Sequence, residues 1–251
     1  MTVTTETLKA LPIFSDLSRE ESALLLRTSR IRKCNRGQFL FMHGDNVAHF
    51  YVICRGAIQM FRETQEGHEV TINILIAGDS INADEVVSGQ AIHRVSARAV
   101  DDVTVLEIPI AWMRKHLKDF HHLTQHLLAS LADRLNNVQI EAEHLTTMNS
   151  AQIVACYLQK LCVLYNFDPR GFELPYTKTL IASRLRMEKE TFSRTLQILP
   201  EHGITVSGTH VSIRDMRKAE GFACHECSVT DECGTHRILH EKLNKYTGQA
   251  G

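Results

Sequence analysis

The sequence predicts an α+β protein in which an N-terminal β-roll of the jelly-roll type precedes a long helix and a C-terminal winged helix-turn-helix unit. Three patterns predict it: evenly spaced glycine turns, an apolar repeat of three and four residues, and a helix pair followed by a hairpin. A chain of 251 residues can hold two ordinary domains. We expect a β-roll over 1–109, a dimerisation helix over 110–148, a winged helix over 149–222 and a cysteine-containing tail over 223–251.

The β-roll is predicted from short strand-like pieces between glycines that recur every 11 or 12 residues, from Gly44 to Gly89. Evenly spaced short strands with turn signals are typical of a sandwich, barrel or jelly roll. The strand-like pieces are Gln38–Met42, His49–Cys54, Ala57–Arg62 and Val70–Leu75, and small helices are expected before them at Leu8–Phe14 and Arg19–Thr28.

A dimer seam is predicted in the long helix. Its apolar residues step alternately by three and four: Leu128, Leu131, Leu135, Val138, Ala142 and Leu145. This narrow stripe with polar flanks favours a parallel two-helix contact over a helix that lies on its own domain, which usually has a wider apolar face. A two-fold dimer would present two copies of any DNA-binding element to a palindromic site.

The winged helix is predicted from the order of elements after the seam. A helix at Ser150–Tyr165 and a short strand at Phe172–Pro175 precede two helical patterns between Thr177 and Leu199. A hairpin that turns at Ser207–Thr209 follows. The segment from Pro175 to Lys218 carries eight Lys and Arg against four Asp and Glu, and this surplus suits contacts to DNA phosphates.

The second helix of the pair is the predicted recognition helix. Its apolar residues Phe192, Leu196 and Leu199 have the spacing of a buried stripe. Arg can hold guanine O6 and N7 bidentately, and Glu can accept a hydrogen bond from cytosine N4. The candidate DNA-binding residues on the polar face are Lys189, Glu190, Ser193, Arg194 and Gln197.

This order of elements, and the residues Glu190-Thr191-Phe192-Ser193-Arg194, resemble the Crp/Fnr family of transcription regulators over roughly residues 8–222. The motif is similar to the E-x-x-S-R motif of the Fnr and Dnr branches, whereas the catabolite-activator branch has Gly at the position of Ser193. The resemblance implies a cyclic-nucleotide-binding-like β-roll and a homodimer that reads a TTGAT-like inverted repeat in double-stranded DNA. It also implies that RNA polymerase is recruited or occluded.

Two local features depart from the family pattern. The corner Leu185-Arg186-Met187 has no glycine, so Arg186 is expected to adopt a left-handed conformation at some cost. Pro200 is expected to end the recognition helix abruptly.

The β-roll lacks the residues that hold a cyclic nucleotide in relatives. Family members that bind one carry a Gly-Glu pair and an Arg-Ser/Thr pair around the phosphate. The corresponding region here reads Ser80-Ile81-Asn82-Ala83-Asp84-Glu85, and His93 stands where the phosphate-binding Arg is expected. Arg94 and Arg98 are partial substitutes, and the sequence argues against cyclic AMP as the ligand.

A metal site is predicted in the tail, where Cys224, Cys227 and Cys233 form a C-x2-C-x5-C pattern that lets three thiolates converge. Zinc would add His236 or His225 as the fourth ligand. A [4Fe–4S] cluster also needs a fourth ligand. The tail resembles that of the Gram-positive Fnr type, which implies an iron–sulfur cluster completed by an acidic residue, and we favour the cluster over zinc. The candidate fourth ligands are His236, Asp231, Glu141, Glu143 and His144.

Haem is a third candidate cofactor, since Dnr-type relatives sense nitric oxide through haem. The candidate histidines are His93, His116, His121, His122 and His126. The family resemblance therefore implies a response to oxygen, redox state or nitric oxide, with the cofactor left open among cluster, haem and zinc.

The remaining features argue against other classes. The chain has no phosphate loop, nucleophile elbow or H-E-x-x-H pattern, so we do not expect an enzyme. No apolar run approaches the roughly 20 residues that span a bilayer. Seven cysteines without an export signal favour a reduced, cytoplasmic protein over a disulfide framework.

Overall fold

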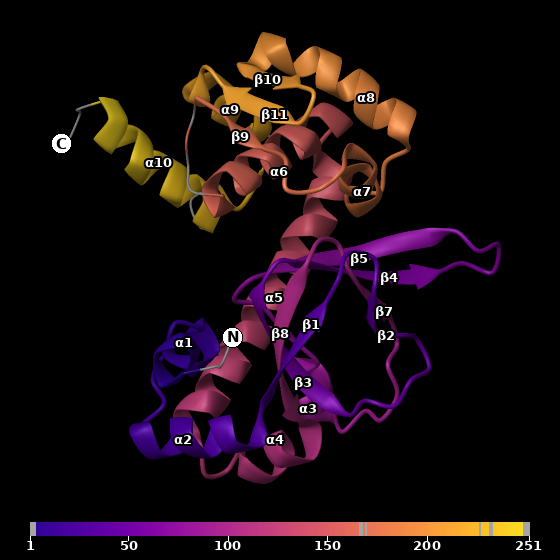
Figure 1. Cartoon of the computed structure of the whole chain (residues 1–251). Helices are drawn as coiled ribbons and strands as arrows, with labels where there is room; N and C mark the ends of the chain where they lie inside the picture. The colour runs from indigo at the N-terminus through magenta and orange to yellow at the C-terminus, as the bar shows by residue number, and fades with distance from the viewer. Residues whose placement is uncertain (1–3, 166–167, 169, 226, 231–232, 248–251) are drawn as a thin grey trace. The chain divides into compact units, whose positions relative to one another are not determined.

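The structure is a computed structural model that describes residues 4–165, 168, 170–225, 227–230 and 233–247. The chain forms two compact units, Met1–Asn136 and Asn137–Gly251, which are described separately below. The mixed α+β architecture that the sequence predicts is confirmed, with a β-roll, a long helix and a helix-turn-helix in that order (Figure 1).

The N-terminal unit is built on two four-stranded antiparallel sheets with strand orders β1-β8-β3-β6 and β2-β7-β4-β5. The strands are β1 (Arg30–Cys34), β2 (Phe39–Phe41), β3 (His49–Arg55), β4 (Ala57–Glu63), β5 (Glu69–Ile76), β6 (Ser80–Ile81), β7 (Ser96–Ala99) and β8 (Val103–Pro109). Side chains from both sheets, such as Ile53, Ile58 and Val105, form one apolar cluster between them. The four predicted strand-like pieces correspond to β2, β3, β4 and β5.

Helices cover one side of the roll. They are α1 (Thr5–Lys9), the 3-10 turn η1 (Pro12–Phe14), α2 (Arg19–Thr28), α3 (Ala83–Ser88) and α4 (Ile110–His116). Together with the start of the next helix they enclose a second core around Phe14, Phe50 and Leu106. The single helix expected at Leu8–Phe14 is divided into α1 and η1, because Pro12 has no N–H to continue a helix.

Helix α5 (His121–Thr147) carries the predicted dimer seam. Its first apolar residues, Leu123 and Leu127, are buried in the N-terminal unit. The seam residues differ, since Leu128, Leu135, Val138 and Leu145 are 55%, 62%, 57% and 44% exposed, Ala142 is also exposed, and Leu131 is half-buried. An isolated chain thus leaves an apolar stripe on α5 in contact with solvent.

The C-terminal unit contains α6 (Ser150–Leu164), β9 (Phe172–Glu173), α7 (Lys178–Arg184), α8 (Lys189–Ile198), η2 (Leu199–His202), β10 (Ile204–Ser207), β11 (His210–Ile213), α9 (Met216–Ala223) and α10 (Gly234–Thr247). The wing is a three-stranded sheet in the order β10-β11-β9, and its hairpin turns where the sequence predicts. Strand β9 is shorter than the predicted Phe172–Pro175, because its partner strand β11 begins only at His210 and Pro175 has no N–H to donate.

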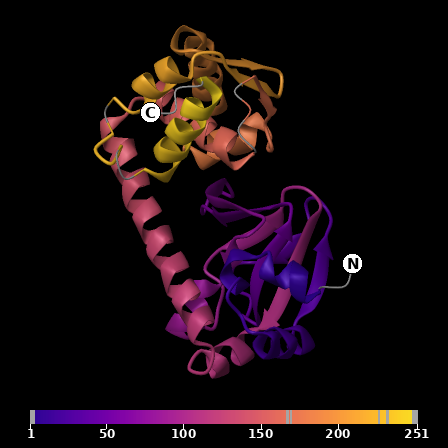
Figure 2. The same ribbon diagram turned by 90° about the vertical axis from the view of Figure 1, so that its left-hand side faces the viewer.

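Helix α6 is the central helix of this unit, and α8, α9 and α10 all pack against it (Figure 2). One turn of this unit depends on glycine. Gly203, at φ 83°, leads into β10, and a Cβ there would lie 2.7 Å from the carbonyl oxygen of Asp215. No helix in the described part of the chain is long and apolar enough to cross a membrane.

Candidate DNA interface and cysteine cluster

Helix α8, the predicted recognition helix, presents its polar face to solvent. Its predicted DNA-binding residues Lys189, Glu190, Ser193, Arg194 and Gln197 are all exposed. The opposite face is anchored by Phe192, Thr195 and Leu199, which are buried, while Leu196 is half-buried. The predicted apolar stripe is therefore correct at Phe192 and Leu199 and shifted by one residue between them.

The corner between α7 and α8 has the backbone that the sequence predicts. Arg186 lies at φ 56°, in the left-handed region. Its N–H donates to the Ser183 carbonyl at 3.1 Å, and the N–H of Met187 donates to the Ala182 carbonyl at 2.9 Å. Thr177 caps the N-terminus of helix α7, since its side chain accepts from the N–H of Leu180. Pro200 lies in the 3-10 turn that follows α8, so the helix stops at Ile198.

The three tail cysteines lie at the end of α9 and in the connection to α10. Cys224 follows the last residue of α9, Cys227 lies three residues further on, and Cys233 directly precedes α10. The backbone turns tightly here, because the N–H of Cys227 donates to the Cys224 carbonyl at 3.1 Å. All three thiols are half-buried and none is in a disulfide.

A fourth cysteine, Cys156 on α6, belongs to the same group and was missed by the sequence reasoning. On its helix it stands between Gln152 and Gln159, at the i+4 and i+7 spacing of one face. Gln152 donates to the carbonyl of Phe222 and Gln159 to that of Ala219, each at 3.2 Å. This face of α6 is therefore the one that contacts α9 next to Cys224.

The ionisation of these thiols reflects their proximity. Burial, together with the neighbouring Cys233 and Cys227, raises the pKa of Cys156 to about 12. Burial and the neighbouring Cys156 and Cys227 likewise raise the pKa of Cys224 to about 12. The neighbouring thiols thus disfavour the thiolate forms of Cys156 and Cys224, and a bound cation would reverse this effect.

The predicted fourth ligands differ in their surroundings. Glu141 forms an ion pair with Arg184 of α7, and Glu143 accepts from the N–H of Ser228 at 2.9 Å, a bond that lowers the pKa of its carboxyl. His144 Nε2 lies 3.5 Å from the sulfur of Cys227. Asp231 lies outside the described residues.

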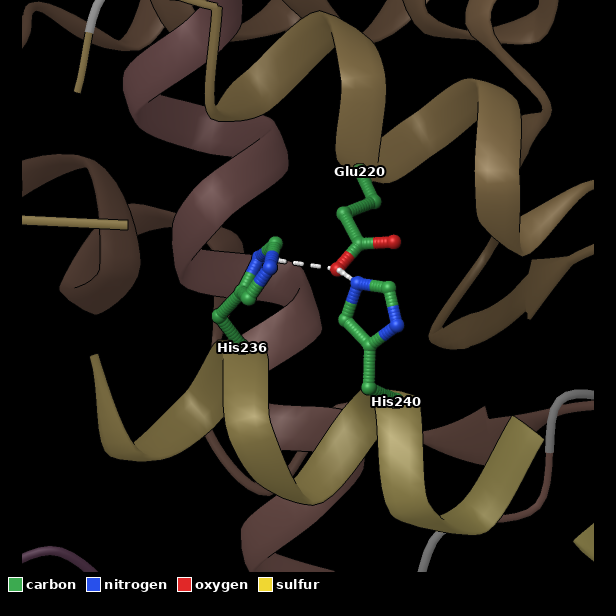
Figure 3. A group of neighbouring side chains, drawn as sticks. All are labelled: Glu220, His236 and His240. Carbon is green, nitrogen blue, oxygen red and sulfur yellow. Dashed lines mark ion pairs between the residues drawn. The ribbon is translucent and has the colours of Figure 1, made fainter. Parts of the chain in front are cut away.

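His236 contacts both the cysteine group and an acidic partner. Its Nδ1 lies 3.7 Å from the sulfur of Cys224 and 2.8 Å from Oε1 of the buried Glu220. His240, one turn later on α10, places Nε2 2.8 Å from the same oxygen (Figure 3). These three side chains bring their ligand atoms within 4.8 Å of one another. These are ion-pair distances, and neither contact has the geometry of a hydrogen bond, since Oε1 of Glu220 has no hydrogen-bond partner among the described residues.

Arg98 and His93, the β-roll residues considered above for binding a phosphate, make other contacts in the structure. Arg98 bonds Glu69 at 2.8 and 2.5 Å and Gln59 at 2.9 Å, and it lies 4.7 Å from the ring centroid of Phe61. His93 is buried and stacks on Phe41 at 3.5 Å between ring centroids. Burial lowers the pKa of His93 to about 4, so at neutral pH it carries no charge for a phosphate.

Among the described residues, the candidate haem histidines do not form a group of three with ring nitrogens within 4.8 Å of one another. His121 and His122 are exposed, His126 pairs with Asp16 at 2.7 Å, and His116 stacks on Trp112. Each of the last two makes an ordinary structural contact within the N-terminal unit.

Comparison with known proteins assigns both units to families. Residues 31–119 match the cyclic nucleotide-binding domain family, and residues 154–218 match the Crp-like helix-turn-helix domain family. The fumarate and nitrate reduction regulatory protein of Salmonella typhimurium is 26% identical over 204 residues, which cover 80% of this chain and 81% of that protein. The anaerobic regulatory protein of Pasteurella multocida is 28% identical over 74% of this chain and 69% of its own.

Solved structures agree with these matches. A putative cAMP-binding regulatory protein from Silicibacter pomeroyi superposes with a TM-score of 0.61 and 27% identity over 87% of this chain and 99% of that one. FixK2 from Bradyrhizobium japonicum shares the fold at a TM-score of 0.68 and 17% identity, over 77% of this chain and 96% of its own.

The β-roll, the long helix and the helix-turn-helix define a DNA-binding transcription regulator, not an enzyme. The chain belongs to the Crp/Fnr family, whose members bind DNA and dimerise.

Proposed function

We propose that the protein is a homodimeric cytoplasmic regulator that reads a TTGAT-like inverted repeat with two copies of α8. The observation that carries this proposal is the exposed polar face of α8, on which Glu190, Ser193 and Arg194 stand together above a buried apolar back. Lys189 and Gln197 extend the same face, and the strands of the wing follow α8 in the chain. Bound to a promoter, the dimer recruits or occludes RNA polymerase.

An Arg194→Ala variant tests the recognition helix. One bidentate Arg–guanine contact contributes about 1–3 kcal/mol of discrimination, and a dimer makes two, so specific affinity is expected to fall at least roughly 30-fold. Arg214→Ala removes the same charge from an exposed position after β11 and should weaken specific and random DNA alike. The measurement is titration of both DNAs over a range of salt. Specific affinity that survives Arg194→Ala would refute α8 as the reading element.

We further propose that the cysteine group holds a [4Fe–4S] cluster that reports oxygen, redox state or nitric oxide. The donor set fits an iron–sulfur centre, because Cys thiolates are the usual ligands of such clusters. Four thiolates around one zinc ion at about 2.3 Å would lie about 3.8 Å apart. Among the described residues these thiols do not form a group with ligand atoms within 4.8 Å of one another. The wider spacing favours a cluster, in which each thiolate binds a different iron.

A route from the cluster to the DNA interface exists within the C-terminal unit. Cys227 and Ser228 contact His144 and Glu143 near the end of α5. On the same helix, Glu141 forms its ion pair with Arg184 of the helix-turn-helix. A change at the cluster would thus act on the end of the dimer seam and on the support of α8, which set the spacing of the two recognition helices.

The absorption spectrum of protein purified without oxygen separates the candidate cofactors. A broad charge-transfer shoulder that bleaches in air supports the cluster, a sharp Soret band supports haem, and a colourless protein that contains zinc supports the zinc alternative. The zinc alternative retains one favourable observation, the proximity of His236 to Cys224. Retention of the colour by a Cys227→Ser variant would contradict the proposal that the tail holds the cofactor.

A further inference from the structure

We propose that Cys156 is the fourth protein ligand, so that α6 and the tail together bind the cluster through four cysteines. This inference rests on the cluster proposed above and adds a ligand from a different part of the chain. It removes the need for an acidic or histidine ligand in this protein.

Cys156 lies on the face of α6 that contacts α9. Gln152 and Gln159 bracket it on one helical face, and both donate their side-chain amides to carbonyls of α9. Along this contact α6 and α9 run antiparallel, since Gln152 bonds Phe222 and Gln159 bonds Ala219. Cys156 therefore faces the last turn of α9, where Cys224 follows.

Cys156 also lies near the three tail cysteines. The tail cysteines lie between α9 and α10, which both pack against α6, the helix of Cys156. In agreement with this, Cys233 and Cys227 contribute to the raised pKa of Cys156, and Cys156 contributes to the raised pKa of Cys224. Cys162, on the same helix, is fully buried, whereas Cys156 is half-buried, and the neighbours of Cys162 are Asp168 and Lys242. A buried Cys commonly serves as a small apolar side chain, as Cys162 does here. Cys156 differs because its neighbours are thiols.

The other candidate fourth ligands have contacts of their own. Glu141 and Glu143 are held by Arg184 and by the N–H of Ser228, and the imidazoles of His144 and His236 lie at hydrogen-bond distance from Cys227 and Cys224. A ring N–H that points at a sulfur stabilises the thiolate, and hydrogen bonds to the sulfurs tune the potential of a cluster. We assign the two histidines to this supporting role. When each Fe–S bond forms, the thiol proton passes to solvent, so cluster binding releases protons.

The test compares variants of the two α6 cysteines in full-length protein purified or reconstituted without oxygen. Iron and acid-labile sulfide per protomer, together with the absorption spectrum, are measured for wild type, Cys156→Ala, Cys156→Ser, Cys162→Ala and Cys227→Ser. We expect Cys156→Ala and Cys227→Ser to lose at least half of the bound iron and Cys162→Ala to keep it. Circular dichroism and dimer mass verify folding.

Serine is nearly isosteric with cysteine, so Cys156→Ser covers the case in which Cys156→Ala does not fold. Its oxygen either fails to hold the cluster or shifts the electron paramagnetic resonance signal of the reduced form, and both results support ligation by Cys156. Wild-type iron content with an unchanged signal in Cys156→Ser, alongside loss in Cys227→Ser, would overturn the assignment while the cluster stands. Wild-type protein that binds no iron would overturn the cluster itself.

Discussion

Removal of one seam side chain should weaken the dimer by an amount that follows from its exposure. Leu135 is 62% exposed in the single chain. Full burial of a Leu side chain contributes about 1.5–3 kcal/mol, so covering this fraction contributes about 0.9–1.9 kcal/mol per protomer. A two-fold contact buries both copies, for about 2–4 kcal/mol per dimer. Because Ala keeps the Cβ, Leu135→Ala should lose about 2–3 kcal/mol, or roughly a 30- to 140-fold increase in the dimer Kd.

Sedimentation equilibrium of wild type, Leu135→Ala and Asn137→Ala measures this change. Asn137 is exposed on the same stretch of α5 but outside the apolar repeat, so its substitution should leave the Kd within about twofold. Affinity for an inverted repeat should fall with the dimer in Leu135→Ala, while affinity for one half-site should not. An unchanged Kd in Leu135→Ala, or equal weakening in both variants, would show that the dimer forms elsewhere.

Two further variants test local features of each unit. Arg186→Gly should be more stable than Arg186→Ala by about 0.5–1 kcal/mol in thermal unfolding. A non-glycine residue at φ 56° costs about 1–2 kcal/mol in the folded state, and glycine removes this cost. Glycine also increases the conformational entropy of the unfolded chain, which offsets part of the gain. Equal stabilities would contradict the strain. In the N-terminal unit, burial lowers the pKa of His93 to about 4. Between about pH 6.5 and 4 the unfolded state therefore binds a proton that the folded state does not, so the free energy of unfolding should fall as the pH drops through this range. A His93→Gln variant should lack that part of the pH dependence, as urea unfolding at both pH values would measure. Burial raises the pKa of Glu85 to about 7, so its protonation stabilises the folded protein as the pH falls. This contribution of Glu85 is present in both proteins and cancels when they are compared.

Elements with a local cause were predictable from the sequence. The glycine turns, the three-and-four repeat of α5 and the Thr177–Leu199 helix pair depend on neighbouring residues, so their positions can be read along the chain. The left-handed Arg186 and the end of α8 before Pro200 follow from the backbone preferences of single residues. Where the prediction missed by one residue, at Thr195 and Leu196, the packing of α8 on α6 decided which side chain is buried.

The cysteine group shows what only the tertiary structure decides. The C-x2-C-x5-C spacing indicates three converging thiols, because its residues are close along the chain. Cys156 stands on an apolar helix that also carries Cys162, and no spacing links it to the tail. Its place beside Cys224 results from the packing of α6 on α9, a contact between residues far apart in sequence. The sequence by itself determined the family, the exposed face of α8 and the three tail cysteines, whereas packing alone brought the fourth thiol to the same point.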